Sequence, residues 1–275
     1  PFLSGGYNTR WQNAGSIESK TMEMTLGANW MRTNDFSWSS NIVFSRVRQK
    51  ITELPIPAYW LDPVSGDVTA FRVAAGETYG AIYGHKMVRS LDEMANQLPE
   101  GDVIGDYVVN SEGYVIAAGT EGTVNERPIL YQENGEVWLG KIGDGNAKFI
   151  MGIANTLTYK GLSFYMLLDW KNGGDVYNSN DQPLSFNNIS KRKDITDVPD
   201  GQKKAASYWS VGMYDANFAN AYWVEDASYL KLREVAIGYT IPARVFSGFL
   251  NGTIKGVTIK AVGRNLYTFT GYSGY

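Results

Sequence analysis

Six stretches of the chain alternate apolar and polar residues, which is the period of a β-strand with one apolar face. From Leu162 to Trp170, for example, every second residue is apolar. Asn155 interrupts the apolar face of the third stretch. The pattern predicts an all-β, antiparallel protein. Its expected strands are Ile17–Trp30, Phe36–Ser45, Phe149–Tyr159, Leu162–Trp170, Asp226–Pro242 and Ile254–Tyr267.

The fifth stretch, DASYLKLREVAIGYTIP (Asp226–Pro242), changes phase in its middle. Leu230 and Leu232 follow one phase, and Val235 and Ile237 follow the other. A slip of one residue turns every later side chain to the opposite face. We therefore predict a β-bulge near Arg233-Glu234, which inserts one extra residue and keeps both apolar sets on one side.

Short and long connections alternate between the predicted strands. Met31–Asp35 and Lys160-Gly161 are short, Ile241–Thr253 is moderate, and Arg46–Lys148 and Lys171–Ala227 are long. A tilted strand needs about 9–11 residues to cross a bilayer, which is the length of these stretches. Transmembrane barrels combine short periplasmic turns with long extracellular loops. The pattern therefore predicts an antiparallel transmembrane β-barrel whose long loops are extracellular.

Aromatic residues mark both ends of these stretches, as in the girdles of transmembrane barrels. Those near the shorter connections are Trp30, Phe36, Trp38, Tyr159 and Tyr239, and those near the far ends are Phe44, Trp170 and Tyr267. Six strands enclose no large pore, and bacterial barrels have an even strand number with both termini on the periplasmic side. We therefore expect at least one further strand after Tyr275 and many before Pro1.

Composition narrows the function classes. A net charge of −3 with 19% charged residues argues against a nucleic-acid binder. A content of 44% apolar and 13% aromatic residues argues against disorder. The chain has no Cys, which excludes a disulfide scaffold and thiolate metal sites.

Helical and targeting signals are scarce. No apolar run reaches the length of a transmembrane helix. The segment PFLSGGYNTRW lacks the pattern of a signal peptide, so the protein is either cytosolic or begins after its targeting segment. The best helix candidate is Ser90–Asn96, with Ser90 as the N-cap.

Two motifs near the end of the chain carry a family resemblance. Ala227–Leu232 (ASYLKL) precedes Val235–Pro242 (VAIGYTIP), and Gly263–Thr268 (GRNLYT) precedes Thr270–Tyr275 (TGYSGY). Together they resemble the C-terminal signature of SusC/RagA-type TonB-dependent outer-membrane transporters. Four further segments resemble blocks of the same family in the same order: Ser16–Leu26, Asp35–Ser45, Gly76–Lys86 and Gly143–Asn178. Gly145 and Ala147 depart from the family pattern, which usually has Pro there.

The resemblance implies a barrel of about 22 strands with an internal plug. Such proteins pair with a SusD-like surface lipoprotein, are typical of Bacteroidetes, and import glycans or oligopeptides across the bacterial outer membrane through TonB. Residues 1–275 are then the C-terminal portion of a longer transporter, without the plug, the TonB-contacting segment and the final strand. Outer-membrane lipid and lipopolysaccharide are the implied surroundings, and no cofactor is implied.

Aromatic residues in the long connections are candidates for contact with substrate or with the partner lipoprotein, because their rings stack on sugars and on peptide side chains. Packing of the loops against one another is at least as good an explanation. The candidates are Tyr59, Trp60, Tyr79, Tyr83, Tyr208, Trp209, Tyr222 and Trp223.

Catalytic and metal-binding patterns are missing. His85 has no partner at metal-ligand spacing. The segments Asp144–Asn146 and Asp175–Asn178 lack the EF-hand pattern and favour Asx and Gly turns. Gly140–Gly145 lacks the ending of a phosphate loop, and no pair of carboxylates is singled out for glycosidase chemistry. Basic residues at Lys191–Lys193 and Lys203-Lys204 favour a solvated loop face over contact with lipopolysaccharide phosphates.

Two other function classes remain open. A soluble extracellular glycan-binding module or adhesin shares the aromatic loops and the lack of Cys, but it predicts polar residues in place of one apolar face of Leu162–Trp170. A glycosidase on a β-scaffold ranks third, since it requires two specific carboxylates.

Overall fold

The computed structural model describes residues 13, 15–61, 68–191, 194–215, 217–246, 253 and 256–274. The chain forms two compact units. The first, which we call the loop unit, comprises Pro1–Lys20, Arg48–Asp144 and Ser179–Trp223. The second, which we call the sheet unit, comprises Thr21–Val47, Gly145–Asn178 and Val224–Tyr275.

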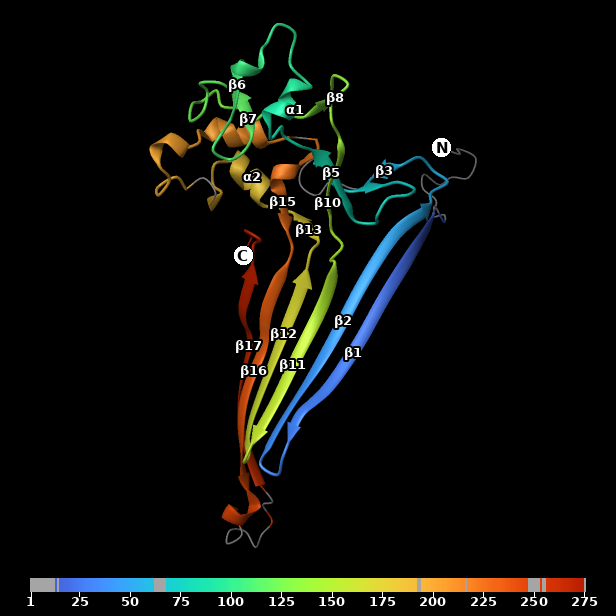
Figure 1. Cartoon of the computed structure of the whole chain (residues 1–275), viewed down its shortest axis with the longest axis vertical. Coiled ribbons are helices and arrows are strands. Elements are labelled where there is room, and N and C mark those ends of the chain that lie inside the picture. The colour runs from blue at the N-terminus through green and yellow to red at the C-terminus, as the bar shows by residue number, and fades with distance from the viewer. Residues whose placement is uncertain are drawn as a thin grey trace, which may run out of the picture. The chain divides into compact units, whose positions relative to one another are not determined.

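Six long strands form one sheet in the order β1-β2-β11-β12-β16-β17 (Figure 1). From β2 to β17 every neighbouring pair is antiparallel. The strands are β1 (Ser16–Arg32), β2 (Phe36–Glu53), β11 (Phe149–Tyr159), β12 (Leu162–Asn172), β16 (Tyr229–Pro242) and β17 (Gly256–Thr270). The six predicted strands and their antiparallel arrangement are confirmed.

The largest differences from the expected bounds are at three places. β2 continues past Ser45 to Glu53, because the alternation goes on there with charged instead of apolar residues. The fifth stretch divides, because the Asp226 side chain accepts hydrogen bonds from the Ser228 N–H and hydroxyl and interrupts the ladder. β15 (Val224–Asp226) then pairs with β13 (Asp175–Tyr177). The sixth strand runs on to Thr270, and the predicted start at Ile254 lies outside the described residues.

The predicted β-bulge is confirmed at Arg233. Leu168 lies opposite Leu232 and Leu167 lies opposite Glu234, so Arg233 is the extra residue of β16. As a result, the apolar residues before and after the bulge face the same side as those of β12. The cross-strand pairs on this face are Trp170–Leu230, Leu168–Leu232, Met166–Val235, Phe164–Ile237 and Leu162–Tyr239.

In its described residues, the loop unit contains short strands, two α-helices and several short helical turns of other types. Its three-stranded sheet has β5 (Ala81–His85) at the centre, between β10 (Gly140–Asp144) and β14 (Ala219–Asn220). The chain comes so close here that a Cβ on Gly84 would lie 2.0 Å from the Ala219 carbonyl oxygen, so only glycine fits. The other strands and α-helices of this unit are β3 (Tyr59–Trp60), β4 (Arg72–Val73), β6 (Tyr107–Val109), β7 (Val115–Ala117), β8 (Gln132–Glu133), β9 (Glu136–Val137), α1 (Leu91–Ala95) and α2 (Asp181–Phe186). A short π-helix spans Tyr208–Met213.

Helix α1 forms where the capping signals placed it. The Ser90 hydroxyl accepts a hydrogen bond from the Glu93 N–H at 3.1 Å, and the Glu93 carboxylate accepts one from the Arg89 N–H. Met94 is buried in a core with Val88 and Val115. Within the described segments, no helix is long and apolar enough to span a membrane.

Deletion of Arg233 tests the role of the bulge. Without the extra residue, either the side chains before the bulge or those after it must turn to the wrong face. We expect the full-length protein to lose its folded form, measured as loss of heat-modifiable mobility on semi-native gels. Arg233→Ala keeps the backbone residue and should still fold. Equal folding of the deletion and the substitution would show that the bulge does not set the register.

Candidate functional site

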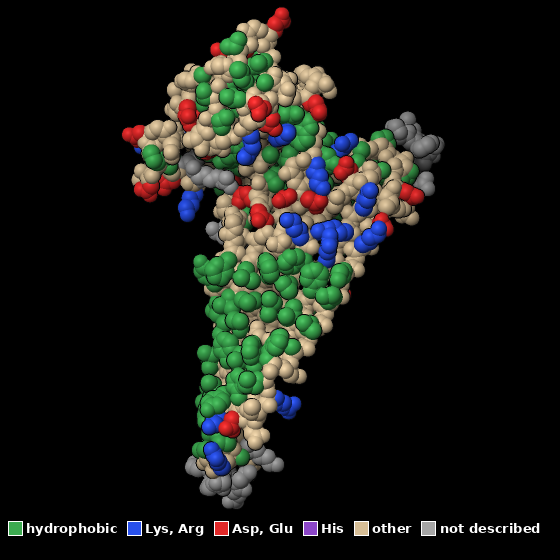
Figure 2. Space-filling view, in the orientation of Figure 1, with side chains coloured by type: hydrophobic (Ala, Val, Ile, Leu, Met, Phe, Trp, Pro, Cys, Tyr) green, Lys and Arg blue, Asp and Glu red, His purple; other side chains and the backbone are tan. Residues whose placement is uncertain are grey.

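The six-stranded sheet has one continuous apolar face. The register places Trp38, Leu157, Phe164 and Ile237 side by side across four strands, with Ala261 next in line. Figure 2 shows this face as an apolar area over the sheet. Large side chains lie open on it, including Leu26 (59% exposed), Ile259 (66%) and Phe269 (59%). An exposed apolar surface of this extent is typical of contact with a membrane or a partner.

A polar cluster lies within that apolar face, around the Asn155 that interrupts the sequence pattern. The Asn155 side-chain oxygen accepts hydrogen bonds from the Ser40 hydroxyl at 2.5 Å and from the Trp38 indole N–H at 3.2 Å. The Trp30 indole N–H donates to the Ser40 oxygen at 2.8 Å. The Ser40 hydroxyl, the Asn155 oxygen and the two indole N–H groups therefore satisfy one another's hydrogen bonds within the apolar face.

The opposite face of the sheet is mostly polar and carries a charged cluster beside the bulge. Asp169 accepts from the Arg233 guanidinium at 2.7 and 2.8 Å, and Glu234 accepts from Arg264 at 3.0 Å. Because the bulge adds a residue, Arg233 and Glu234 both reach this face. A groove of about 440 Å³ lies beside them, with an apolar floor that includes Val43, Ile150 and Leu167.

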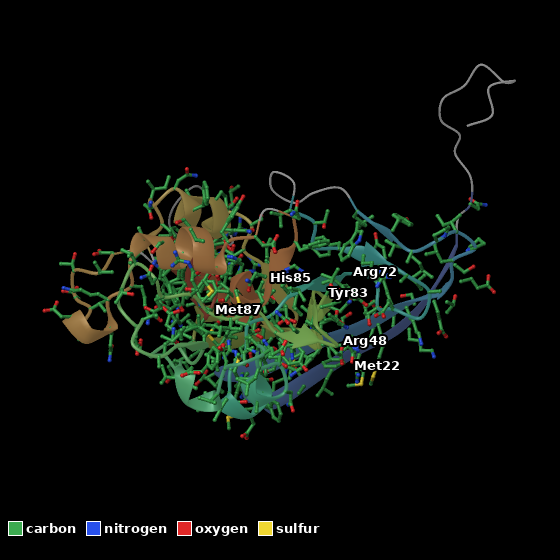
Figure 3. All side chains as sticks on the ribbon, turned by 90° about the horizontal axis from the view of Figure 1, so that it is seen from above. Met22, Arg48, Arg72, Tyr83, His85 and Met87 are labelled. Atoms are coloured by element: carbon green, nitrogen blue, oxygen red, sulfur yellow. The ribbon has the colours of Figure 1, made fainter. Side chains whose placement is uncertain are left out.

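In the loop unit, one aromatic group surrounds β5. Trp60 lies against Tyr83 (6.2 Å between ring centroids) and Phe218 (5.5 Å), and Arg72 lies 5.8 Å from the Tyr83 ring. Figure 3 labels Arg72, Tyr83 and His85. Burial and a hydrogen bond to Glu77 raise the pKa of Tyr83 to about 12. Tyr83 therefore stays protonated and acts as a packed ring in this cluster.

His85 pairs with Asp215. The His85 Nδ1 lies 2.8 Å from the Asp215 carboxylate, which also accepts hydrogen bonds from the Asn217 and Phe218 N–H groups. Burial raises the pKa of Asp215, but the hydrogen bonds from His85 and the two backbone N–H groups outweigh it and hold the pKa below its ordinary value. The pair ties β5 to the segment before β14, so its observed role is structural.

A second aromatic group surrounds a buried ion cluster. Tyr208 packs edge-on against Trp209, and Tyr222 lies between Trp209 and Trp223. Beside them the Lys204 ammonium, 4% exposed, lies 2.7 Å from Glu126 and 3.1 Å from Glu121. The expectation of a solvated loop face is therefore wrong for Lys204, because its ammonium group is buried and pairs with two carboxylates. Arg192 and Lys193 lie outside the described residues.

The aromatic candidates differ in exposure. Tyr83, Tyr208, Trp209 and Trp223 are buried, and Trp60 and Tyr222 are half-buried. Tyr59 (41% exposed) and Tyr79 (44%) remain at the surface and line a groove of about 190 Å³ with Ile17, Leu61 and Val73. Among the candidates, these two rings are the most accessible for contact with a substrate or a partner.

No sequence pattern marks either charged cluster. The change of phase at Arg233 was a signal for the bulge, but no pattern linked it to Asp169, 64 residues away in sequence. Lys204 and Glu126 are 78 residues apart and carry no local motif. In the described part of the chain, no three His, Asp or Glu side chains come together as a metal site.

Comparison with known proteins identifies the relatives of this chain. No protein-family model matches it. TonB-dependent receptor P3 of Formosa agariphila is 26% identical over 98% of this chain, and receptor P26 of the same organism is 25% identical over 97%. The chain is homologous to TonB-dependent receptors. It spans about a quarter of the length of these two receptors, 26% in each case.

Solved structures show the same fold. The RagAB peptide importer in its closed-closed state matches with a TM-score of 0.65 at 19% identity, over 99% of this chain and 28% of that chain. The RagAB peptide transporter matches with a TM-score of 0.62 at 17% identity, over 100% and 28%. The fold is thus similar to part of RagAB, a SusC/RagA-type transporter, and the relatives that the chain matches in sequence are TonB-dependent receptors.

The buried ion cluster predicts a large effect of Lys204→Met. Removing the ammonium leaves Glu126, which is fully buried, without its ion-pair partner, and breaking a buried pair costs about 3–5 kcal/mol. We expect faster hydrogen exchange at the Gly122 N–H, which donates to Glu126, in the full-length protein.

The neighbouring substitution Lys203→Met is the matched control. Lys203 pairs at the surface with Asp200, whose side chain is 95% exposed, and such pairs contribute about 0–1 kcal/mol. If both substitutions changed exchange at Gly122 equally, the buried cluster would not stabilise the loop unit.

Low pH should weaken the contact between the His85 and Asp215 side chains. A carboxyl group whose folded pKa is depressed contributes stability above its unfolded pKa, near 3.9, and loses it as the pH falls through the lower folded value. We expect the protection of the β5 amides, relative to their intrinsic exchange rate at each pH, to decrease as the pH falls below about 4, and Asp215→Asn to decrease it already at neutral pH. Asp200→Asn, at an exposed site, should leave β5 unchanged.

Proposed function

We propose that the sheet is a sector of the wall of a transmembrane β-barrel in the bacterial outer membrane, and that the whole protein imports oligopeptides or glycans with energy from TonB. The observation that carries the proposal is the continuous apolar face opposite a charged, polar face. Transmembrane barrel strands alternate lipid-facing and lumen-facing residues in this way. Homology to TonB-dependent receptors supports the same conclusion.

The proposed closure of the barrel is supported by the physics of the membrane. An open sheet edge in hydrocarbon leaves backbone N–H and C=O groups without partners, at a cost of several kcal/mol each. β1 and β17 are the two edges of the described sheet. We propose that strands outside this chain pair with them, in a barrel of about 22 strands, and that residues 1–275 form the C-terminal portion.

The connections give the proposed orientation. Tyr159 and Tyr239 lie near the short connections of the sheet, which we assign to the periplasmic side. The long connections, which form the loop unit, would then be extracellular. There Tyr59 and Tyr79 could meet a substrate or a SusD-like lipoprotein, by analogy with RagAB. Contact with TonB would belong to a part of the protein outside this chain.

Transport by intact cells tests the function. Cells with the full-length protein and its partner should accumulate a labelled oligopeptide or glycan, and a protonophore should abolish the accumulation. Parallel assays with peptide and glycan pools separate the two substrate classes. Accumulation that survives both the protonophore and deletion of the gene would contradict the proposal, and the soluble glycan-binding module would then be the better explanation.

Two neighbouring leucines test the membrane-facing side. Leu168 lies on the apolar face, opposite Leu232, whereas Leu167 lies on the polar face, opposite Glu234. Leu168→Arg should destabilise the folded protein by about 2–4 kcal/mol, the cost of arginine on the lipid face near the bilayer midplane. Leu167→Arg should cost much less, because water and Glu234 are available to its charge. Urea unfolding in lipid vesicles measures both, and equal costs would exclude the assigned sides.

A further inference from the structure

A cavity of about 710 Å³ lies beside α1 and β8 in the loop unit. Figure 1 shows these two elements next to each other. The lining residues come from segments 94–99 and 129–135, together with Tyr107, and all of them belong to this one compact unit. Small-molecule sites have volumes of about 300–1,000 Å³, so the cavity is large enough for a ligand.

The floor of this cavity is apolar. Met94 and Tyr107 belong to a buried core, and Leu98 and Ile129 pack against it. The Tyr107 hydroxyl donates a hydrogen bond to the Asp102 carboxylate, and Tyr107 is only 9% exposed, so its ring offers no open face for stacking. The accessible floor is therefore aliphatic, and the packed core beneath holds it in place.

The walls of the cavity carry side-chain amides. One of them, on Gln97, donates to the Leu130 carbonyl at 2.9 Å and accepts from the Gln132 N–H at 2.8 Å. Within the described residues, the side-chain amides of Gln132 and Asn134 have no hydrogen-bond partner, although both residues line the cavity. A side-chain amide offers one acceptor oxygen and two N–H donors. Two amides are therefore available to a ligand.

A tight turn holds the Asn134 amide at the wall. Asn134 and Gly135 have φ angles of 55° and 81°, and they join β8 to β9 with Glu133 opposite Glu136. A positive φ at both central residues is typical of the two-residue turn that suits the twist of a hairpin. A ligand would therefore meet Asn134 in a position set by the same hairpin that contains Gln132.

The lining of the cavity is electrically neutral. Among the described residues that form it, none is charged. Segments 94–107 and 129–135 contain no Lys or Arg, and their acidic residues are Glu100, Asp102, Asp106 and Glu133. These carboxylates would repel an anionic ligand, and a cation would lose its hydration in the cavity without gaining an ion-pair partner there. The cavity therefore favours a neutral ligand.

The backbone beside the cavity is closed to a peptide. One common way to bind an extended peptide is to add it as a strand to a free sheet edge. Here the Leu130 carbonyl and the Gln132 N–H are both bonded to Gln97, and the Tyr131 N–H donates to the Lys86 carbonyl at 2.9 Å. Recognition in the cavity must therefore come from side chains.

A neutral ligand that fits these surfaces combines a small apolar group with an amide. The acetamido group of an N-acetylated amino sugar has both, because its methyl group suits the aliphatic floor and its N–H and C=O complement a side-chain amide. We propose that the cavity binds an N-acetylhexosamine unit of a glycan, with the acetamido group at Gln132 and Asn134 and its methyl group on Met94 and Ile129. This inference rests on the proposed function, in which the loop unit is extracellular, and it narrows the imported substrate to one class of glycan.

Matched sugars test the inference. Full-length protein in detergent is titrated with tri-N-acetylchitotriose, with its deacetylated form and with cellotriose, which has hydroxyl groups in place of the acetamido groups. Isothermal titration calorimetry measures binding. We expect the N-acetylated sugar to bind about tenfold more tightly than either of the others, since it alone buries a methyl group and bonds through an amide. An alanine tripeptide with blocked ends represents the peptide class.

Two variants assign the binding to this cavity. Gln132→Leu removes one amide, and Asn134→Gly removes the other with a residue that suits a left-handed φ. Each should weaken binding of the N-acetylated sugar by about tenfold, because the ligand's amide then loses a partner. Gln202→Leu is the matched control and should bind like the wild type, since Gln202 is exposed in the same unit and does not line the cavity. If Gln132→Leu does not fold, Asn134→Gly, at an exposed turn, carries the test.

Four results would overturn the inference: no binding of the N-acetylated sugar at millimolar concentrations, equal binding of the three sugars, equal binding by the wild type and the cavity variants, or tighter binding of the peptide. Binding in detergent does not depend on transport. Selective binding without protonophore-sensitive uptake would therefore keep the cavity's ligand and contradict the import function. Protonophore-sensitive uptake without selective binding would do the reverse.

Discussion

Register is the constraint on which the sheet depends. Side chains alternate with a period of two, so a shift of one residue would move the whole apolar set of a strand to the polar face. β12 and β17 lie on either side of β16, and both pair with it on each side of Arg233. The bulge therefore has to be accommodated by two neighbours. β17 does so with Asn265, which adopts a left-handed φ of 51° and accepts a hydrogen bond from Arg233 at 3.2 Å.

The same constraint explains the polar residues on the apolar face. Asn155 and Ser40 lie directly opposite each other, because the register that aligns the apolar neighbours also aligns them. Trp38 can only donate a hydrogen bond, so its contact fixes which end of the Asn155 amide is the oxygen. Asn155, which interrupts the apolar pattern of its strand, is thus accommodated on the apolar face. The two indoles make this possible because each has an apolar ring and a hydrogen-bond donor.

Sequence alone predicted the sheet well and the loop unit poorly, and the reason is physical. Strand pattern is local: each of the six strands could be recognised from its own residues, and even the bulge appeared as a change of phase. The contacts of the loop unit join distant residues, such as His85 with Asp215 and Lys204 with Glu126. These partners belong to no common sequence motif or periodic pattern, so neither segment predicts its contact with the other. α1 is the exception, because capping by Ser90 and Glu93 is again local.

The long-range contacts also limit how the loops can move. The second long connection places Lys204 between Glu121 and Glu126 of the first, and it adds β14 to the edge of β5. Phe218 from the same connection packs against Trp60 and His85. Separating the connections would break the buried ion pair between the Glu126 carboxylate and the Lys204 ammonium, at a free-energy cost far above thermal energy. The two connections therefore behave as one folded body.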